Sequence, residues 1–274
     1  MVNALGKLGI WRPATLIDGD LAREVEKLGY GAIWLGGSPD AGLEIVDELL
    51  DTTEHIVVAT GIVNMWKADA PAVGESYHRI VARHPGRFLL GVGIGHPEAT
   101  SVYRKPYDKI VEYLDQLDEA GVPVADRALA ALGRKVLKVS AERTAGAHPY
   151  LTTPEHTRQA REVLGKGALL VPEQTLVLST DPGEARRTGH NFVKRYLGLR
   201  NYVGNLKRLG WSDEDVAGEG SDALVDALVP HGNAETIFAA TQAHLDAGAD
   251  QVCIQVLGKD PLPGYRAVAQ VLLS

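Results

Sequence analysis

Two hydrophobic periods alternate along the chain. Short apolar runs of strand-like character occur at 8–11, 32–35, 56–63, 87–94, 128–132, 147–151, 175–179 and 251–257. Between them, apolar residues recur every three or four positions, as Leu21, Val25 and Leu28 do, and similar spacing recurs within 45–50, 110–117 and 237–245. Apolar residues at this spacing are typical of amphipathic helices. Repeated alternation of strand and helix predicts parallel strands.

Helix start signals support this pattern. Thr153-Pro154-Glu155 and Asp181-Pro182-Gly183-Glu184 each offer a capping side chain followed by proline at the first helical position. Eight strand–helix units without a break in composition predict an α/β fold, a single (β/α)8 TIM barrel over residues 1–274. The seventh crossover, about 181–250, is much longer than the others, and we expect it to hold a helical insertion packed outside the barrel.

Composition narrows the classes of partner and location. No apolar run approaches the roughly 20 residues of a membrane span, so we expect no membrane contact. The net charge is −7 and no block of Lys and Arg stands out, which argues against nucleic acid. The first residues show no secretory pattern, and the single cysteine, Cys253, has apolar neighbours and excludes an internal disulfide. We therefore expect a cytoplasmic protein with an inert thiol.

The glycines at 91, 93 and 95 end in His96, just after the fourth expected strand. Barrel enzymes bind ligands at the carboxyl ends of the strands, so His96 is a candidate site residue. The spacing fails the dinucleotide fingerprint, which needs G-x-G-x-x-G after the first strand of its unit and an acidic residue about 20 positions later. Gly91 and Gly93 have an alternative explanation, which is relief of crowding between barrel strands.

Other strand ends also carry unusual residues. Gly61 interrupts a β-branched run and suggests a bulge before Asn64. Gly133 opens a helix with Arg134 and Lys135, where free backbone N–H groups and positive charge suit an anion. The end of the sixth expected strand supplies His148 and Tyr150, and the end of the second supplies Gly36 and Gly37.

Several chemistries lack their motifs. His55, His156 and His244 fall on helix ends or faces, where we expect structural roles. There is no H-E-x-x-H, H-x-H or paired-cysteine spacing, so we predict no metal site. There is also no G-x-S-x-G nucleophile elbow.

The chain resembles the luciferase-like monooxygenase superfamily along its whole length. The resemblance lies in LGIW, AREVEKLGYGAIWL, HIVVATGIVN, HPGRFLLGVGIG and HLDAGADQVCIQVL. A further stretch, AALGRKVLKVSAERTAGAHPYLTTPEHTRQARE, looks most like the actinobacterial branch that uses the deazaflavin coenzyme F420. The resemblance implies a TIM barrel that binds a deazaflavin, or alternatively FMN, at the strand ends.

The resemblance also implies roles for particular residues. A non-prolyl cis peptide bond is expected at Gly61-Ile62, bracing one face of the ring, and the cofactor phosphate is expected beside Leu132, Gly133 and Arg134. The expected cofactor contacts are Gly36, Gly37, Gly61, Ile62, Asn64, Gly93, Gly95, Leu132, Gly133 and Arg134. In this picture bare main chain at 61, 93 and 133 forms the surface on which the ring lies.

The chain departs from the family's sugar-phosphate and alcohol dehydrogenases. Those enzymes end the second strand with an Asp-His pair and place Glu after the glycines of the fourth. Here the matching positions read Gly37-Ser38 and His96. His96 is therefore a candidate for proton transfer, or for a hydrogen bond to the cofactor, and His148 is the second catalytic candidate.

The predicted function is hydride transfer between the deazaflavin and a small organic substrate. Trp11, Trp66 and Tyr150 are the candidate substrate-pocket residues, whereas Trp34 lies inside a strand and is expected to pack. A tryptophan-bearing mouth favours a hydrophobic carbonyl or enone.

Three alternatives remain open: an FMN-dependent monooxygenase, a non-catalytic deazaflavin carrier, and an aldolase or isomerase. The last needs a lysine or a carboxylate pair at strand ends, which we do not find. The family resemblance also implies a homodimer.

Overall fold

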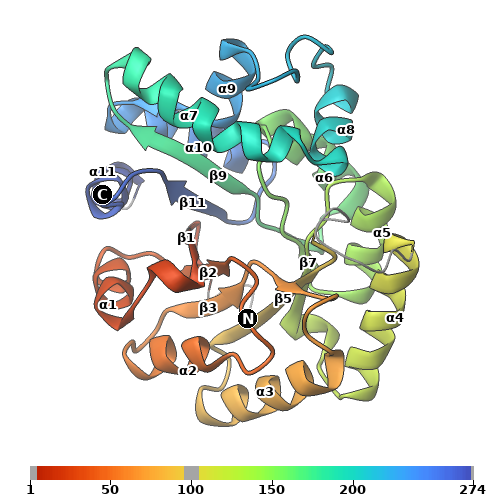
Figure 1. Cartoon of the computed structure of the whole chain (residues 1–274). Helices are drawn as coiled ribbons and strands as arrows, with labels where there is room; N and C mark the ends of the chain where they lie inside the picture. Colours follow the sequence, from red (N-terminus) through yellow and green to blue (C-terminus); the bar gives the residue numbers. More distant parts are fainter. Residues whose placement is uncertain (1–4, 96–104, 273–274) are drawn as a thin grey trace.

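The computed structural model describes residues 5–95 and 105–272 of the 274-residue chain, and the predicted site residue His96 lies outside them. The strands alternate with helices along most of the chain (Figure 1). They are β1 (Leu8–Pro13), β2 (Ala32–Gly36), β3 (Val57–Thr60), β4 (Val63–Asn64), β5 (Phe88–Gly93), β6 (Arg127–Leu129), β7 (Gly146–Ala147), β8 (Leu169–Leu170), β9 (Glu173–Leu178), β10 (His231–Gly232) and β11 (Val252–Val256).

The strands form one parallel arrangement in the order β10-β9-β11-β1-β2-β3-β5-β6-β7-β8, with β4 pairing with β5. The two parts of the seventh barrel strand, β8 and β9, are separated only by Val171 and Pro172. The Val171 N–H donates to Ala147 O at 2.9 Å, and the Cys253 N–H donates to Pro172 O at 3.1 Å. The chain itself therefore joins the two ends of the ring, and the predicted (β/α)8 barrel is confirmed.

Side chains alternate between the inside and the outside of the barrel. Ile10 and Ile33 pair in register and belong to the large apolar cluster between the strands and the surrounding helices. Their neighbours Trp11 and Trp34 also pair in register and belong to the interior cluster. This two-residue period is what parallel strands covered by helices require.

The helices are α1 (Gly19–Lys27), α2 (Glu44–Asp51), α3 (Ala70–Arg83), α4 (Pro106–Glu119), α5 (Arg134–Arg143), α6 (Pro154–Leu164), α7 (Pro182–Leu197), α8 (Arg200–Arg208), α9 (Asp222–Leu228), α10 (Ala234–Asp246) and α11 (Leu262–Leu272), with short 3₁₀ turns at Ala14–Leu16 and Val124–Asp126. Several begin at an acidic or amide cap: Asp18 accepts from the Leu21 N–H at 2.9 Å, and Asn233 accepts from the Thr236 N–H at 3.0 Å. Such caps satisfy N–H groups that the first turn leaves without partners. None of these helices is long and apolar enough to cross a membrane.

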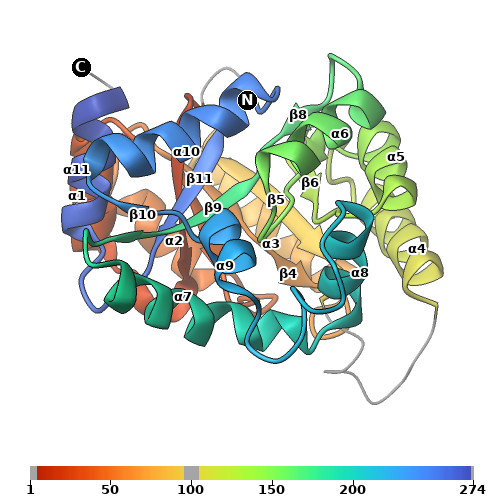
Figure 2. The ribbon, with the colours of Figure 1, turned by 90° about the horizontal axis from the view of Figure 1, so that it is seen from above.

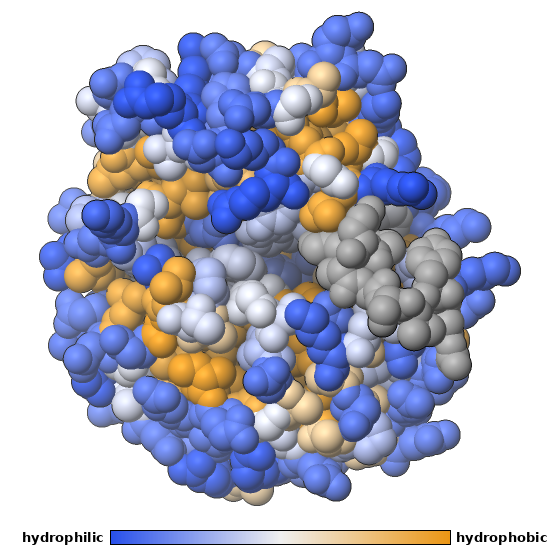
Figure 3. Space-filling view, viewed as in Figure 1, coloured by the Kyte–Doolittle hydropathy of each residue, from blue (hydrophilic) through white to orange (hydrophobic). Residues whose placement is uncertain are grey.

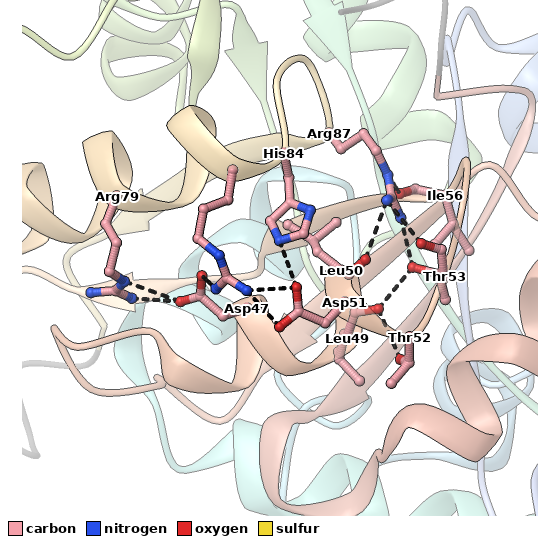
Figure 4. A network of polar contacts seen from close by, with 11 residues as sticks. Asp47, Leu49, Leu50, Asp51, Thr52, Thr53, Ile56, Arg79, His84 and Arg87 are labelled. Atoms are coloured by element: carbon pink, nitrogen blue, oxygen red, sulfur yellow. Dashed lines mark hydrogen bonds and ion pairs between the residues drawn. The ribbon is translucent and has the colours of Figure 1, made fainter.

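An ion-pair network ties α2 to α3 (Figure 4). Asp47 accepts from Arg79 and from Arg83, each at 2.7 Å. Asp51 accepts from Arg83 at 2.8 Å and lies 3.1 Å from His84 Nε2. The two helices are thus held side by side by charge as well as by apolar packing.

The seventh crossover forms the insertion, which is the segment from α7 to β10. Its helices α7, α8 and α9 enclose a separate apolar cluster that includes Phe192, Tyr202 and Leu224 and also takes in Leu151 and Val177 of the barrel. Viewed from above, α7 lies along one side of the molecule and α10 along the opposite side (Figure 2). The helix α10 packs against β9, β11 and α11 and acts as the ordinary crossover helix.

One end of the barrel is sealed by buried groups. Leu5 is 1% exposed and its carbonyl accepts a hydrogen bond from Gln251 Nε2. Gln251 Oε1 accepts from Trp34 Nε1 at 2.8 Å. These contacts lie before β1 and at the start of β11, which is the amino-terminal end of the barrel.

The seventh barrel strand, made of β8 and β9, begins earlier than the sequence pattern predicts. The apolar run indicated 175–179, whereas β8 and β9 span 169–170 and 173–178. Pro172, Glu173 and Gln174 break the apolar pattern, yet all are buried in the barrel. Buried polar residues that find partners inside the fold are invisible to a hydrophobic period.

Candidate functional site

Partly exposed apolar side chains gather where the strands end. We call this set the mouth; it comprises Ile62, Leu132, Tyr150 and Leu257. In the view of Figure 1, the surface is hollowed near its centre, with hydrophobic patches at the margins (Figure 3). Apolar linings with few polar groups are usual for organic cofactors and ligands.

Trp11 fills the centre of the barrel just below the mouth. Its indole Nε1 donates to Gly61 O at 3.1 Å, and its ring lies directly against Gly36, where any side chain would overlap it. The Tyr150 ring is 5.0 Å away, centroid to centroid. Trp11 is 8% exposed, so it contributes a narrow edge to the surface.

The peptide bond between Gly61 and Ile62 is cis, which confirms the predicted conformation of this bond. A Cβ on Gly61 would lie 2.9 Å from His148 Nε2 and 3.0 Å from Trp11 Nε1. The space beside Gly61 is therefore taken by side chains of the same chain.

The glycines of β5, at 91 and 93, are also explained by close packing. A Cβ on Gly91 would overlap the carbonyl oxygen of Thr60, so close strand packing requires glycine there. A Cβ on Gly93 would lie 2.8 Å from Ala130 Cβ and 2.9 Å from Ile62 Cγ1. Internal packing thus accounts for glycine at 61 and 93, and the expectation that main chain at these positions forms the floor for a ring stays a prediction.

Asn64 and Trp66 lie beyond the bulge. Asn64 is buried, its Oδ1 accepts from the Trp66 N–H at 2.9 Å, and its amide occupies the space beside Gly95, whose φ is +63°. The Trp66 ring faces away toward α4, where Lys109 Nζ is 5.9 Å from its centroid. Trp66 lines a surface groove between α3 and α4.

His148 lies in the barrel interior. It is 1% exposed, stacks on Trp34 at 4.3 Å, and its Nδ1–H donates to Val171 O at 2.8 Å. Burial lowers its pKa to about 4, so the imidazole is neutral. Among the residues that the structure describes, its Nε2 has no hydrogen-bond partner. This placement favours a structural role beneath the mouth over proton transfer at its surface.

The start of α5 offers an anion site. Gly133 caps the helix with no side-chain hydrogen bond, so N–H groups of the first turn remain available. A Cβ on Gly133 would lie 3.9 Å from Arg208 Nη2 of α8, the only contact within 4 Å that the described residues make there outside the start of α5 itself. His156 Nε2–H donates to Leu132 O at 2.9 Å and fixes the preceding residue. Arg134 and Lys135 are exposed beside it and add positive charge.

Glu173 is the polar residue of the site that the sequence pattern misses. It is fully buried at the start of β9, and its neighbour Tyr150 connects the barrel to the insertion. Tyr150 OH donates to Gln255 Oε1 at 3.2 Å and is 2.9 Å from the Tyr196 hydroxyl of α7. Three consecutive polar residues at 173–175, after Pro172, are the signal that would have found this strand end.

The structure thus brings together most of the predicted residues and separates some. Those that meet at the mouth or just below it are Trp11, Gly36, Gly61, Ile62, Gly93, Leu132, Gly133, His148 and Tyr150. Gly37 is exposed with φ +81° at the end of β2, and Trp66 faces the α3–α4 groove.

The residues present fit a flavin-type cofactor at two points. The open, positively charged start of α5 suits a phosphate, because helix N-termini present N–H groups and a positive dipole to anions. The mouth presents apolar surface to a flat ring above Trp11.

No protein-family model matches the chain, and no curated protein matches its sequence. Solved structures do match. An F420-dependent secondary alcohol dehydrogenase in complex with an F420–acetone adduct is 12% identical, with a TM-score of 0.76 and 98% of both chains covered. The F420-dependent tetrahydromethanopterin reductase of Methanopyrus kandleri is 14% identical, with a TM-score of 0.70 over 98% of this chain and 99% of that one.

A third match binds a different cofactor. The oxygenating constituent of 3,6-diketocamphane monooxygenase from Pseudomonas putida, in complex with FMN, is 14% identical, with a TM-score of 0.66 over 97% of both chains. The chain has the fold of these oxidoreductases. The barrel fold expected from the sequence is therefore confirmed, and the matches cover nearly the whole chain.

Proposed function

We propose that this luciferase-like chain is an oxidoreductase that binds coenzyme F420 and transfers a hydride between it and a small organic substrate. The observation that carries the proposal is the start of α5, where Gly133 leaves open space, free N–H groups and the Arg208 guanidinium on one side of an apolar mouth. A deazaflavin supplies hydride chemistry when bound; the chain supplies placement.

The residues divide this work. Gly133, Arg134 and Arg208 hold the phosphate through N–H groups and positive charge. Trp11 and Ile62 support the ring from below, and the remaining apolar residues of the mouth exclude water around the substrate. This lining favours a hydrophobic carbonyl or enone. His96 remains the proposed proton-transfer residue, and we further expect a cytoplasmic homodimer.

Titration with oxidised F420 and with FMN, followed by fluorescence quenching, tests the proposal. We expect F420 to bind more tightly. Arg208→Gln should weaken F420 binding about tenfold or more, because a hydrogen bond between charged groups is worth roughly 1.5–3 kcal/mol. Arg158→Gln is the matched control, because Arg158 pairs with Glu155 and Glu162 on the exposed face of α6.

Other outcomes identify the alternatives. Tighter binding of FMN, with oxygen consumption when the bound flavin is reduced, would replace the proposal by an FMN monooxygenase. Tight F420 binding with no turnover across a panel of carbonyl and enone acceptors would indicate a deazaflavin carrier.

A further inference from the structure

Glu173 is a buried carboxyl with two specific hydrogen bonds. Its Oε1 accepts from the Thr175 hydroxyl at 2.5 Å, and its Oε2 accepts from the Leu151 N–H at 3.1 Å. Its exposed fraction is 0%, and within residues 5–95 and 105–272 it has no ion-pair partner. Burying a carboxyl without a cation beside it is costly in free energy, so the buried position of Glu173 requires an explanation.

The bond to Leu151 falls at an unusual backbone position. Leu151 has φ +52°, a left-handed conformation that residues with a side chain seldom adopt. This conformation is unfavourable and persists only where the surroundings impose it. The side chain of Leu151 is buried in the apolar cluster of the insertion, so both its main chain and its side chain are held.

The Leu151 turn directs Tyr150 at the mouth. Tyr150 immediately precedes the left-handed residue, and its ring contacts Trp11 at 5.0 Å and the Tyr196 ring at 5.5 Å. A change of backbone conformation at Leu151 would therefore move the aromatic group that joins the barrel to α7.

We propose that Glu173 is a positioning residue that, through the Leu151 N–H, holds Tyr150 against Trp11 and so sets the shape of the mouth. It acts through the main chain and does not itself touch a ligand. The inference rests on the proposed function only for the identity of the ligand that the mouth receives.

The strength of the hydrogen bond between Glu173 and the Leu151 N–H depends on whether the Glu173 carboxyl is ionised. Burial raises the pKa of Glu173 to about 7, against the lowering effect of its bonds to Thr175 and Leu151. The titratable groups that face it are Tyr150, Tyr196 on α7, Tyr202 on α8 and Cys253 on β11; burial raises the pKa of each, and the Glu173 charge adds to the rise. His148, whose Nδ1 lies 3.9 Å from Cys253 Sγ, is neutral because burial lowers its pKa to about 4. A carboxylate accepts the Leu151 N–H more strongly than a protonated carboxyl does.

The first test needs no ligand. In amide NMR of the full chain, the Leu151 N–H shift should titrate between pH 5.5 and 8.5 with a midpoint near the Glu173 pKa, about 7. Glu173→Gln should abolish this titration. Thr175→Val should move the midpoint to higher pH, because the Thr175 hydroxyl lowers the Glu173 pKa. A Leu151 shift that ignores pH, or that titrates equally in Glu173→Gln, overturns the proposal.

The second test uses F420 as the probe. We expect the affinity of the wild type for F420 to change several-fold across the same pH range, relative to Glu173→Gln at each pH. Circular dichroism and the Tm of each variant show whether it is folded. Equal pH profiles for wild type and Glu173→Gln would overturn the positioning role while leaving the proposed function intact. Absence of F420 binding at every pH would overturn the proposed function, and the NMR titration would still decide the role of Glu173.

Discussion

Buried histidines show how much a single residue depends on its surroundings. His244 is 0% exposed; its Nδ1 accepts from the Thr157 hydroxyl at 2.7 Å and its Nε2–H donates to Gln174 Oε1 at 2.9 Å. Burial, with a smaller contribution from His156, lowers its pKa to about 3. This neutral ring joins α10 to α6 and to β9, in agreement with the structural role expected from its place on a helix.

We expect His244 to make the fold sensitive to acid. Its folded pKa lies below the unfolded value of 6.5, so the unfolded chain binds the extra proton and stability falls as pH drops from about 6.5 toward 3. By pH 4.5 this loss amounts to about 2–3 kcal/mol, at 1.36 kcal/mol per pH unit.

Urea unfolding of wild type and His244→Gln between pH 7 and pH 4.5 measures this effect. The free energy of unfolding of the wild type should fall more steeply than that of His244→Gln, whose side chain does not titrate. Parallel curves for the two proteins would show that His244 is not a source of acid sensitivity.

The residues of the site were only partly predictable. The Gly61-Ile62 cis bond was expected from the family resemblance and is present. By contrast, the sequence alone does not indicate that His148 lies in the barrel interior, because a side chain at a strand end can face either the interior or the solvent. The role of Glu173 was missed because a glutamate in a sequence normally predicts an exposed side chain. Only the fold supplies its buried hydrogen-bond partners.

At the scale of elements, Arg87 joins the end of α2 to the start of β5 (Figure 4). Its guanidinium donates to the carbonyl oxygens of Leu50, Thr53 and Ile56 at 2.9–3.2 Å, and to the Thr53 hydroxyl at 2.6 Å. Leu50 lies in the last turn of α2, where carbonyls have no partner within the helix, and Thr53 and Ile56 lie in the segment that leads to β3. One side chain therefore satisfies carbonyls of both.

We predict that Arg87→Met lowers the free energy of unfolding by about 2–4 kcal/mol, because it leaves partly buried carbonyls without donors. Thermal and urea unfolding measure the change. Arg158→Met on exposed α6 is the control, and its effect should stay within about 0.5 kcal/mol. A comparable loss in both variants would refute the role of Arg87.

Strands with a clean hydrophobic period were predicted well, whereas those expected at 147–151 and 175–179 were not; β7 covers only Gly146–Ala147. The expected strands at 8–11 and 32–35 match β1 and β2 to within two residues. The seventh barrel strand (β8 and β9) was predicted too short because Glu173 and Gln174 interrupt its apolar run. In the structure the Glu173 carboxyl accepts from Thr175 of β9, and the Gln174 amide donates to Leu228 O of α9.

At the scale of the whole molecule, the two ends of the barrel differ. The amino-terminal end is closed by Leu5 and Gln251, whereas the carboxyl end carries the mouth and faces the insertion. Closed ends opposite the site are expected in TIM barrels, whose stability and function lie at different faces.

Leu5→Ala should therefore destabilise the whole barrel by about 2–5 kcal/mol without changing F420 affinity. The control is Leu16→Ala: Leu16 is 57% exposed after β1, and its removal should change the Tm little. Calorimetry gives the stability and fluorescence titration gives the affinity. Loss of affinity in a folded Leu5→Ala protein would contradict this separation of the two ends.

The position of Trp11 decides how the barrel can be re-engineered. Its indole stands between Gly36 and Gly61, neither of which carries a side chain of its own. Replacing Trp11 by a smaller residue would open a cavity between these two glycines, whereas replacing residues of the mouth would only widen the entrance. If the proposed function holds, Trp11 is therefore the position to change for a bulkier substrate.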